Sequence, residues 1–290
     1  MSFQIVTDSP ANLPYRLVKK YGLKTISLDY FIGEERFDTN SETEDDKWQR
    51  DFYASIRDKK KVTTSCINAD TLKNVFKEIL DTGTDLIYIA FSSGLSKTYE
   101  NGKNTVDELK TEYPDRKIYI VDTLAASLGE GLLVDYACRQ KEAGKSIEEI
   151  YQWQEENKLK LCHWFTVDDL FFLKRGGRVS AATAIAGTVL GIKPVLHVDN
   201  EGHLINVDKA RGRKQSLIEL VNRMEKTAID PKNQRVFIAH GDCIEDCKFV
   251  EKLVRERFGT KDIELNFVNP AIGAHSGPGT IALFFIGSER

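Results

Sequence analysis

Features that would place this chain in several common classes are missing. No run of about 18 apolar residues occurs, so no membrane-spanning helix is predicted. The first residues have neither the basic nor the apolar region of a signal peptide, and we therefore expect a cytoplasmic protein. The formal net charge of −3 at pH 7 gives no electrostatic case for nucleic-acid binding, which usually requires a basic domain.

Cysteine is present but supplies no disulfide framework. The 5 cysteines are odd in number and include no C-x-x-C pair, so we expect reduced thiols. Cys243 and Cys247 are four positions apart and follow His240, a spacing that places the two thiols on one face of a predicted helix. Because no fourth ligand stands nearby, we expect thiols that face the core and no metal site.

The sequence also lacks one signature of nucleotide-binding proteins and one signature of hydrolases. Neither the G-x-x-x-x-G-K-[ST] loop that cradles phosphates nor the G-x-S-x-G nucleophile elbow occurs, and no cofactor is predicted.

At 290 residues with 41% hydrophobic residues, the chain is long enough for two packed domains. We predict an N-terminal α/β domain over residues 1–160 and a C-terminal α/β domain over residues 161–290.

Strand and helix patterns alternate through the first half. The run at 85–91 is almost continuously apolar, which is typical of a strand buried in a parallel sheet. Ser146 and Glu149 form a capping box that predicts the start of a helix. The fold class is therefore α/β, with a mainly parallel first sheet flanked by helices. Strands are predicted at 3–7, 24–31, 85–91 and 117–121, and in the second half at 159–167, 191–198, 203–208, 235–240, 262–268 and 280–286.

Hydroxyl residues cluster where predicted strands end and helices begin. Thr64 and Ser65 precede a predicted helix at 68–80, and Ser92–Tyr99 follows the buried strand at 85–91. A helix cap needs one hydroxyl, so the surplus favours an anion-binding edge of the sheet. We expect backbone N–H groups after Ser92–Ser93 to contribute to it. Plain helix capping is the alternative for Thr64 and Ser96.

A second polar stretch lies in the middle of the chain. Gly177 allows backbone to approach a ligand closely, and Arg178 can clamp a carboxylate or phosphate. Ser180 is suited to begin the Ala-rich helix predicted after it. The alternative for Gly177 and Arg178 is a tight turn with a structural or solvated arginine.

Five stretches, taken in order, resemble the DegV family of bacterial fatty-acid-binding proteins. The resemblance covers essentially the whole chain and implies two α/β domains with a fatty-acid tunnel between them. It also implies a carrier without its own catalytic apparatus, which presents the fatty acid to a separate fatty acid kinase. The five stretches are Val6–Ser9, Thr63–Ser65, Ser92–Tyr99, Gly177–Ser180 with Gly191–Pro194, and Ala274–Gly279.

The resemblance also implies roles for single residues. The fatty-acid carboxylate would be bound by Thr64, Ser65, Ser93, Ser96 and His275. Arg178, Gly94 and Gly177 would support the ligand site, and Arg211 would dock the kinase. The alternatives are a structural role for His275 and a solvated Arg211. The remaining histidines are expected to be structural: His163, His197, His203 and His240.

Two residues depart from the family pattern, and they leave open which acyl chain is bound and whether a kinase partner exists. Cys66 stands where the family commonly has Gln, and Lys97 stands where it commonly has Gly, so acyl chain length and kinase partnership stay open.

Two other functions also stay open. One is an enzyme, a phosphotransferase or hydrolase with Ser96 as nucleophile and His275 as base. The other is a binder of a different anionic lipid.

Overall fold

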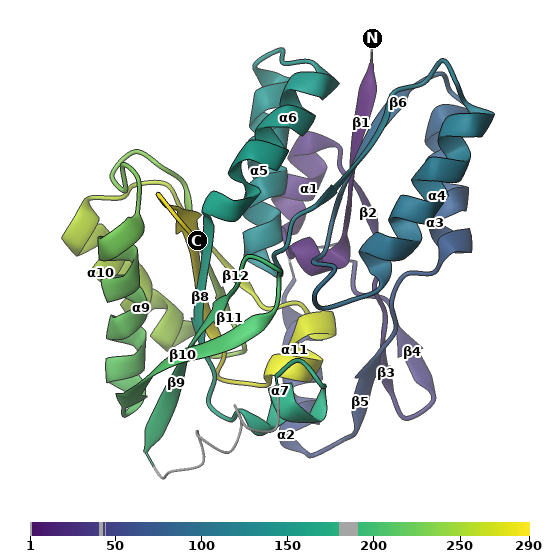
Figure 1. The fold of residues 1–290 in the computed structure, drawn as a ribbon. Coiled ribbons are helices and arrows are strands. Elements are labelled where there is room, and N and C mark those ends of the chain that lie inside the picture. The colour runs from purple at the N-terminus through teal and green to yellow at the C-terminus, as the bar shows by residue number, and fades with distance from the viewer. Residues whose placement is uncertain (1, 41–42, 44, 180–190) are drawn as a thin grey trace.

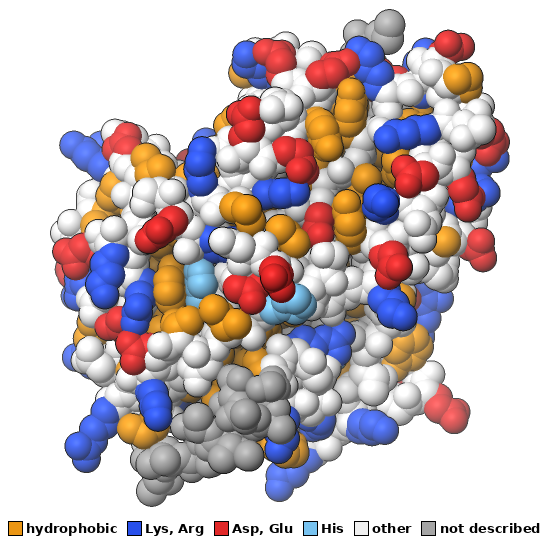
Figure 2. All heavy atoms as spheres, in the orientation of Figure 1, with side chains coloured by type: hydrophobic (Ala, Val, Ile, Leu, Met, Phe, Trp, Pro, Cys, Tyr) orange, Lys and Arg blue, Asp and Glu red, His pale blue; other side chains and the backbone are white. Residues whose placement is uncertain are grey.

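A computed structural model describes residues 2–40, 43, 45–179 and 191–290. Its described strands form sheets of four, six and three strands, with helices packed on and between them (Figure 1). No described helix is long and apolar enough to cross a membrane. On the face drawn in Figure 2, acidic and basic side chains are intermixed, and neither sign gathers into one large patch.

The first sheet is parallel throughout, which confirms the mainly parallel arrangement predicted for the first half. All six residues of its strand β6 are buried, as the apolar run predicted. Helices α3 and α4 cover one face, and α1, α5 and α6 lie on the other (Figure 1). The strands in spatial order are β2 (Lys24–Ile26), β1 (Phe3–Asp8), β6 (Asp85–Ala90) and β7 (Ile118–Asp122). The helices are α1 (Tyr15–Tyr21), α3 (Ala69–Leu80), α4 (Thr98–Glu112), α5 (Leu128–Glu142) and α6 (Ile147–Asn157).

The second sheet is mixed, and only β11 and β12 pair in parallel among its described strands. Helices α9 (Arg213–Thr227) and α10 (Ile244–Phe258) cover its outer face. Helix α5 packs against its inner face and also against the first sheet, so one buried cluster spans both sheets (Figure 1). The strands in order are β10 (Leu204–Arg211), β9 (Ile192–Val198), β8 (Leu161–Thr166), β13 (Ile281–Ile286), β11 (Val236–His240) and β12 (Ile263–Phe267). The proposed boundary at 160/161 falls between η2 (Lys158–Lys160) and β8, and it stays a prediction.

The single strand predicted at 24–31 is wrong. The chain leaves the first sheet after β2 and enters a small antiparallel sheet of β4 (Glu35–Phe37), β3 (Tyr30–Ile32) and β5 (Val62–Thr64). The bend between β2 and β3 is fixed because the Leu28 N–H donates to Ser9 Oγ (2.9 Å). Helix α2 (Lys47–Arg57) packs Phe52 and Tyr53 on this small sheet.

Capping residues mark the starts of helices α6 and α11. The Ser146–Glu149 capping box is confirmed, with both reciprocal hydrogen bonds formed at the start of α6. Helix α11 (Pro270–Ser276) is not among the predicted helices. It begins where Asn269 accepts from the Ala271 N–H, with proline in the first turn. Two other short helices are η1 (Ser9–Ala11) and α7 (Phe171–Arg175). The helix predicted to start at Ser180 lies outside the described residues.

The thiols are not joined in disulfides. All 5 cysteines are free, and Cys247 on α10 is buried while Cys243, just before that helix, is half-buried. No group of three or more His, Cys, Asp or Glu side chains in the described part of the chain could hold a metal ion. The Cys243 N–H instead donates to His240 Nδ1 (3.4 Å), which places that histidine in the local backbone structure.

Candidate functional site

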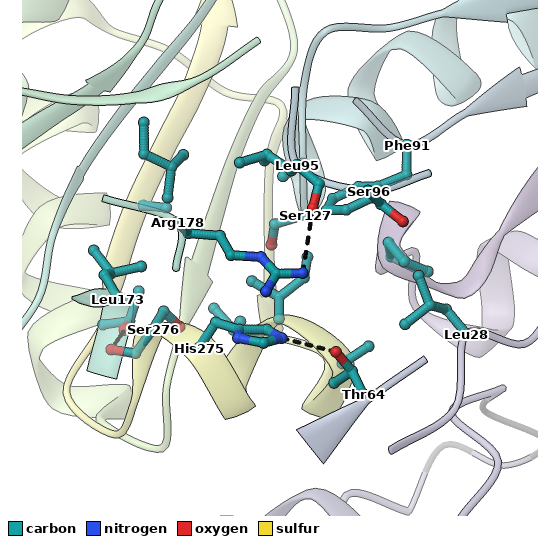
Figure 3. A pocket seen from close by; sticks show the side chains of 18 of the residues that line it. Leu28, Thr64, Phe91, Leu95, Ser96, Ser127, Leu173, Arg178, His275 and Ser276 are labelled. Carbon is teal, nitrogen blue, oxygen red and sulfur yellow. Dashed lines mark hydrogen bonds between the residues drawn. The ribbon is translucent and has the colours of Figure 1, made fainter. Parts of the chain in front are cut away.

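A cavity of about 450 Å³ lies between the two larger sheets (Figure 3). The first half contributes the loops that follow β1, β6 and β7, and the second half contributes β8, β13 and α11. Connections leave β1 and β6 in opposite directions, and the crevice beyond such a switch point is the usual ligand site of a parallel sheet. Most of the wall is apolar: Pro10, Leu28, Phe91, Leu95, Ala126, Phe165, Leu173, Leu204, Val268, Ala271, Ile272 and Ala282.

Thr64 and His275 meet at this cavity although 211 residues separate them. Thr64 is the last residue of β5 and His275 lies in the last turn of α11, and Thr64 Oγ1 is 2.8 Å from His275 Nε2. Burial, with the positive charges of Arg178 and Arg175, lowers the pKa of His275 to about 3. The ring is therefore neutral at pH 7, with one donor and one acceptor nitrogen. Gly176 lies so close to His275 Nδ1 that a Cβ at this position would collide with the ring.

Arg178 lies next to this pair with its guanidinium directed toward the loop after β6 (Figure 3). Its Nη1 donates to the Gly176 carbonyl and its Nη2 to the Leu95 carbonyl (3.3 Å). No carboxylate of a described residue lies within ion-pair distance of this half-buried guanidinium. Burial lowers the pKa of Arg178, which means that desolvation of the cation is not offset by a protein anion.

Ser96 is held as a local cap and still faces the cavity. Its Oγ accepts from the Thr98 N–H (3.2 Å) and is 2.9 Å from Thr98 Oγ1. Thr98 Oγ1 in turn accepts from the Ile67 N–H, so when Thr98 donates to Ser96, the Ser96 hydroxyl proton is available to a ligand. Capping and ligand contact are therefore compatible at Ser96.

The backbone of the same loop is not available as expected. The N–H groups of Ser93 and Gly94 donate to Asp122 Oδ1 and Ser92 Oγ (both 3.1 Å), and those of Leu95 and Ser96 donate to the Ser92 carbonyl. The prediction that these N–H groups hold an anion is wrong, because the turn uses them to close on itself. Side chains must supply the polar contacts.

Other predicted residues take different places around the cavity. Ser65 and Ser93 line it from exposed positions, together with Cys66 and Lys97, the two departures from the family pattern. The carboxylate-binding roles of Ser65 and Ser93 stay predictions, and no role was predicted for Cys66 or Lys97. Arg211 lies exposed at the end of β10 and does not line the cavity.

The two glycines serve the backbone. A Cβ at Gly94 would lie 2.7 Å from the Glu201 carbonyl oxygen, so this glycine lets the β9–β10 hairpin approach the loop after β6. Gly177 has φ +73°, and no described atom lies within 4 Å of a Cβ built there, so its positive φ is what favours glycine at this position. Neither observation places a glycine against a ligand.

Two lining residues had no role in the sequence analysis. Ser127 precedes α5 with φ 55°, and its buried Oγ has no hydrogen-bond partner among the residues that the structure describes. A strained, unpaired serine at a cavity wall is typical of a functional position. His163, expected to be structural only, lines the cavity while its ring lies 4.5 Å from that of Phe284. Backbone strain at Ser127 leaves no sequence signal, and His163 belongs to a strand whose facing could not be read from its continuous apolar pattern.

The arrangement does not form the nucleophile–base pair of the enzyme alternative. The hydrogen-bond partner of Ser96 Oγ is Thr98, and that of His275 Nε2 is Thr64. No described carboxylate is hydrogen-bonded to the His275 ring to orient it. What the site offers is a half-buried arginine, an exposed lysine, several hydroxyls and a neutral imidazole at an apolar cavity. This combination is suited to a carboxylate with a long apolar tail.

Known proteins resemble this chain over its full length. The family model described as "Uncharacterised protein, DegV family" matches residues 2–288. A DegV domain-containing protein of Clostridium perfringens is 44% identical, covering 99% of this chain and 98% of that protein. A DegV lipid-binding protein of Thermotoga maritima has a TM-score of 0.87 at 25% identity, covering 100% of both chains. A Thermus thermophilus DegV family protein, described by its fatty acid binding, has a TM-score of 0.86 at 26% identity, covering 99% of this chain and 100% of that one.

Proposed function

The chain belongs to the DegV family, and from this premise we propose that it binds one long-chain fatty acid in the cavity between its two larger sheets. Its tail lies along the apolar wall, and its carboxylate is bound by Arg178, Thr64, Ser96 and His275, with Ser65 and Ser93 at the rim. The observation that carries the proposal is Arg178: a half-buried cation at an apolar cavity, with no carboxylate of a described residue within ion-pair distance. A carboxylate would supply the missing charge.

The cavity and the lining suit an acyl chain. The volume of about 450 Å³ falls within the range of roughly 300–1,000 Å³ that is usual for small-molecule sites. Each methylene removed from water contributes about 0.8 kcal/mol, so a chain of about 16 carbons gains on the order of 10 kcal/mol before ordering costs. Tail burial therefore supplies most of the affinity, and the polar groups fix which end enters first.

The protein acts as a carrier and not as an enzyme in this proposal. The kinase-docking role implied for Arg211 fits its exposure on the edge strand β10, away from the cavity. A separate fatty acid kinase would then act on the carboxylate at the cavity mouth. The free thiols fit a reducing compartment, as expected for the cytoplasm.

The head-group assignment is tested with the double variant Thr64→Val with Ser96→Ala. Loss of two hydrogen bonds to a charged group, each about 1.5–3 kcal/mol, should weaken palmitate binding by at least about a hundredfold in calorimetric titration. Thr63→Val is the matched control, because alternation along β5 turns Thr63 away from the cavity. Unchanged palmitate affinity in the double variant would overturn the assignment. Turnover of an acyl ester or of ATP by the protein alone would favour the enzyme alternative.

A further inference from the structure

The hairpin between β9 and β10 reaches across from the second half of the chain to the first (Figure 1). Its tip, residues 199–203, lies against the loop that follows β6, where Ser92 Oγ donates to the Gly202 carbonyl (3.0 Å). Ser93 and Leu204 are the chain neighbours of this contact, and both line the cavity proposed to hold the fatty acid. The tip therefore lies at the wall of that cavity.

The tip is closed by its own hydrogen bonds. The Asp199 side chain accepts from the N–H groups of Glu201 and His203 (both 2.9 Å), and the Asp199 carbonyl accepts from the Gly202 N–H (3.0 Å). An aspartate that accepts from the backbone two residues on fixes a turn without help from other segments. The tip can therefore move as one body and keep its shape away from the first half.

A second connection between the tip and the first half runs through Arg290, which follows β13. A guanidinium has five N–H donors, and here each of them donates to a backbone carbonyl at 2.7 to 3.4 Å. Arg290 has no donor left for a ligand, so its contribution is to the segments that it joins. The accepting carbonyls are those of Thr123, Leu124, Lys158, Leu161 and Asp199.

The segments that Arg290 joins come from both halves of the chain. They are the loop after β7 in the first half, and η2 with the start of β8 and the hairpin tip in the second. Within a few positions of its contact with Arg290, each segment has a residue that lines the fatty-acid cavity: Ser127, His163 and Leu204. Arg290 therefore holds three parts of the cavity wall together.

Desolvation offsets part of what these five hydrogen bonds contribute. No carboxylate of a described residue lies within ion-pair distance of the Arg290 guanidinium. Burial lowers the pKa of Arg290 to about 10, and the more distant carboxylates of Asp199 and Asp122 offset only part of this effect. A cation that is buried without an ion-pair partner regains hydration when it leaves its carbonyls, so the connection can open and close.

We propose that the tip at 199–203 is a lid on the fatty-acid cavity, held closed by Arg290 and Ser92. When both connections break, the tip lifts from the loop after β6 and opens the wall beside Ser93 and Leu204, where the fatty acid enters and leaves. The lid rests on the proposed fatty-acid function. Arg290 and Ser92 are positioning residues, because neither lines the cavity.

The test is stopped-flow uptake and release of the fluorescent C18 fatty acid cis-parinaric acid by the full chain. Arg290→Met should raise both rates by at least about tenfold, and Ser92→Ala, which removes one neutral hydrogen bond to the tip, by roughly 2–12-fold. Because both rates rise together, the dissociation constant should change by less than about threefold.

Arg255→Met is the matched control for the loss of an arginine. Arg255 also donates to two backbone carbonyls, those of Thr260 (3.3 Å) and Lys261 (3.0 Å), but it lies on α10 outside the cavity lining. Both rates should equal those of the wild type in this variant. If Arg290→Met does not fold, Ser92→Ala decides the question alone.

Three results would overturn the proposal. One is wild-type uptake and release in Arg290→Met and Ser92→Ala. Another is faster release with unchanged uptake, so that affinity falls by the same factor, which would make the tip a contact surface for the ligand and not a lid. The third is a wild-type protein that takes up no fatty acid at all, in which case the proposed function fails together with the lid; in the first two cases the proposed function stands.

Discussion

Two arginines lie between the halves of this molecule in opposite surroundings. Arg235, just before β11, is 8% exposed and meets Asp262 (2.7 Å), Asp135 (3.1 Å) and Glu264 (3.3 Å). Arg178 meets two backbone carbonyls and no carboxylate of the described chain. Carboxylates therefore neutralise the buried Arg235, whereas the half-buried Arg178 at the apolar cavity has no carboxylate partner among the described residues.

The difference in ion pairing indicates that Arg235 stabilises the fold and that Arg178 serves the ligand site. Asp135 is on α5 and Glu264 is on β12, so Arg235 ties the helix between the sheets to the second sheet. Arg16 on α1 adds a second cation to Glu264. Arg178 has no such network, and its desolvation is unfavourable until an anion enters. An arginine that the fold does not neutralise is the better sign of a ligand site.

The largest expected effect comes from removing the neutralised cation. Arg235→Met removes the buried guanidinium between Asp135 and Glu264 and leaves these carboxylates only the more exposed Arg139 and Arg16 as cations. The loss should lower the free energy of unfolding by about 3 kcal/mol, the lower end of the range for a broken buried ion pair. Arg178→Met, the matched substitution, should leave ligand-free stability unchanged or slightly raised. Urea unfolding of both ligand-free variants measures this contrast, and equal destabilisation would remove the distinction between the two sites.

The next effect is on binding. Arg178→Met removes a charge-assisted contact of about 1.5–3 kcal/mol and should weaken palmitate affinity by roughly 10–150-fold in calorimetric titration. Arg211→Met is the control, since Arg211 is exposed and lies outside the cavity lining. Wild-type affinity in Arg178→Met would mean that the cation has a purely structural role.

The difference between Arg178 and Arg235 should become smaller if Arg178 is given a carboxylate partner within the protein. Ser96→Asp keeps a side-chain acceptor for the Thr98 N–H and adds a carboxylate beside the Leu95 carbonyl that Arg178 already contacts. We expect weaker palmitate binding and a ligand-free stability gain of up to about 1 kcal/mol at low salt. Ser96→Asn keeps the cap without the charge and should show no stability gain. If Asn and Asp behave alike, charge is not what matters at this position.

The smallest effect concerns protonation. The pKa of His275 is lowered to about 3 by burial and by the nearby arginines, so its neutral form is favoured in the folded state. Between pH 6.5 and 3 the unfolded chain binds a proton there that the folded chain does not, and stability falls as the pH falls. His197 and His240, with pKa values lowered to about 4, act in the same direction. Arg178→Met or bound palmitate should raise the pKa of His275, as followed by NMR titration; a shift downward in either case would contradict the account.

Sequence patterns predicted the parts of the fold where one local signal dominates. The apolar run of β6 and the Ser146 capping box each determine their element without distant partners. The break between β2 and β3 was not predictable, since it depends on Ser9 from an earlier loop accepting the Leu28 N–H. α11 was missed because proline and three glycines around a short segment resemble a loop.

The site was predicted only in part for a similar reason. The resemblance named Thr64, Ser96, Arg178 and His275, and the structure places all four around one cavity. The use of the Ser93–Ser96 N–H groups to close the turn depends partly on Asp122 at the end of β7, which spacing cannot reveal. The strain at Ser127 and the neutralisation of Arg235 are likewise properties of the packed structure.

The most direct test of the unpaired arginine is native mass spectrometry of wild type and Arg178→Met as purified, followed by lipid extraction and identification. We expect one C14–C18 fatty acid per wild-type chain. We expect Arg178→Met to be as stable as the wild type but to carry little bound fatty acid. A wild-type protein that is empty and takes up no added fatty acid, or an Arg178→Met protein that retains the lipid equally well, would contradict it.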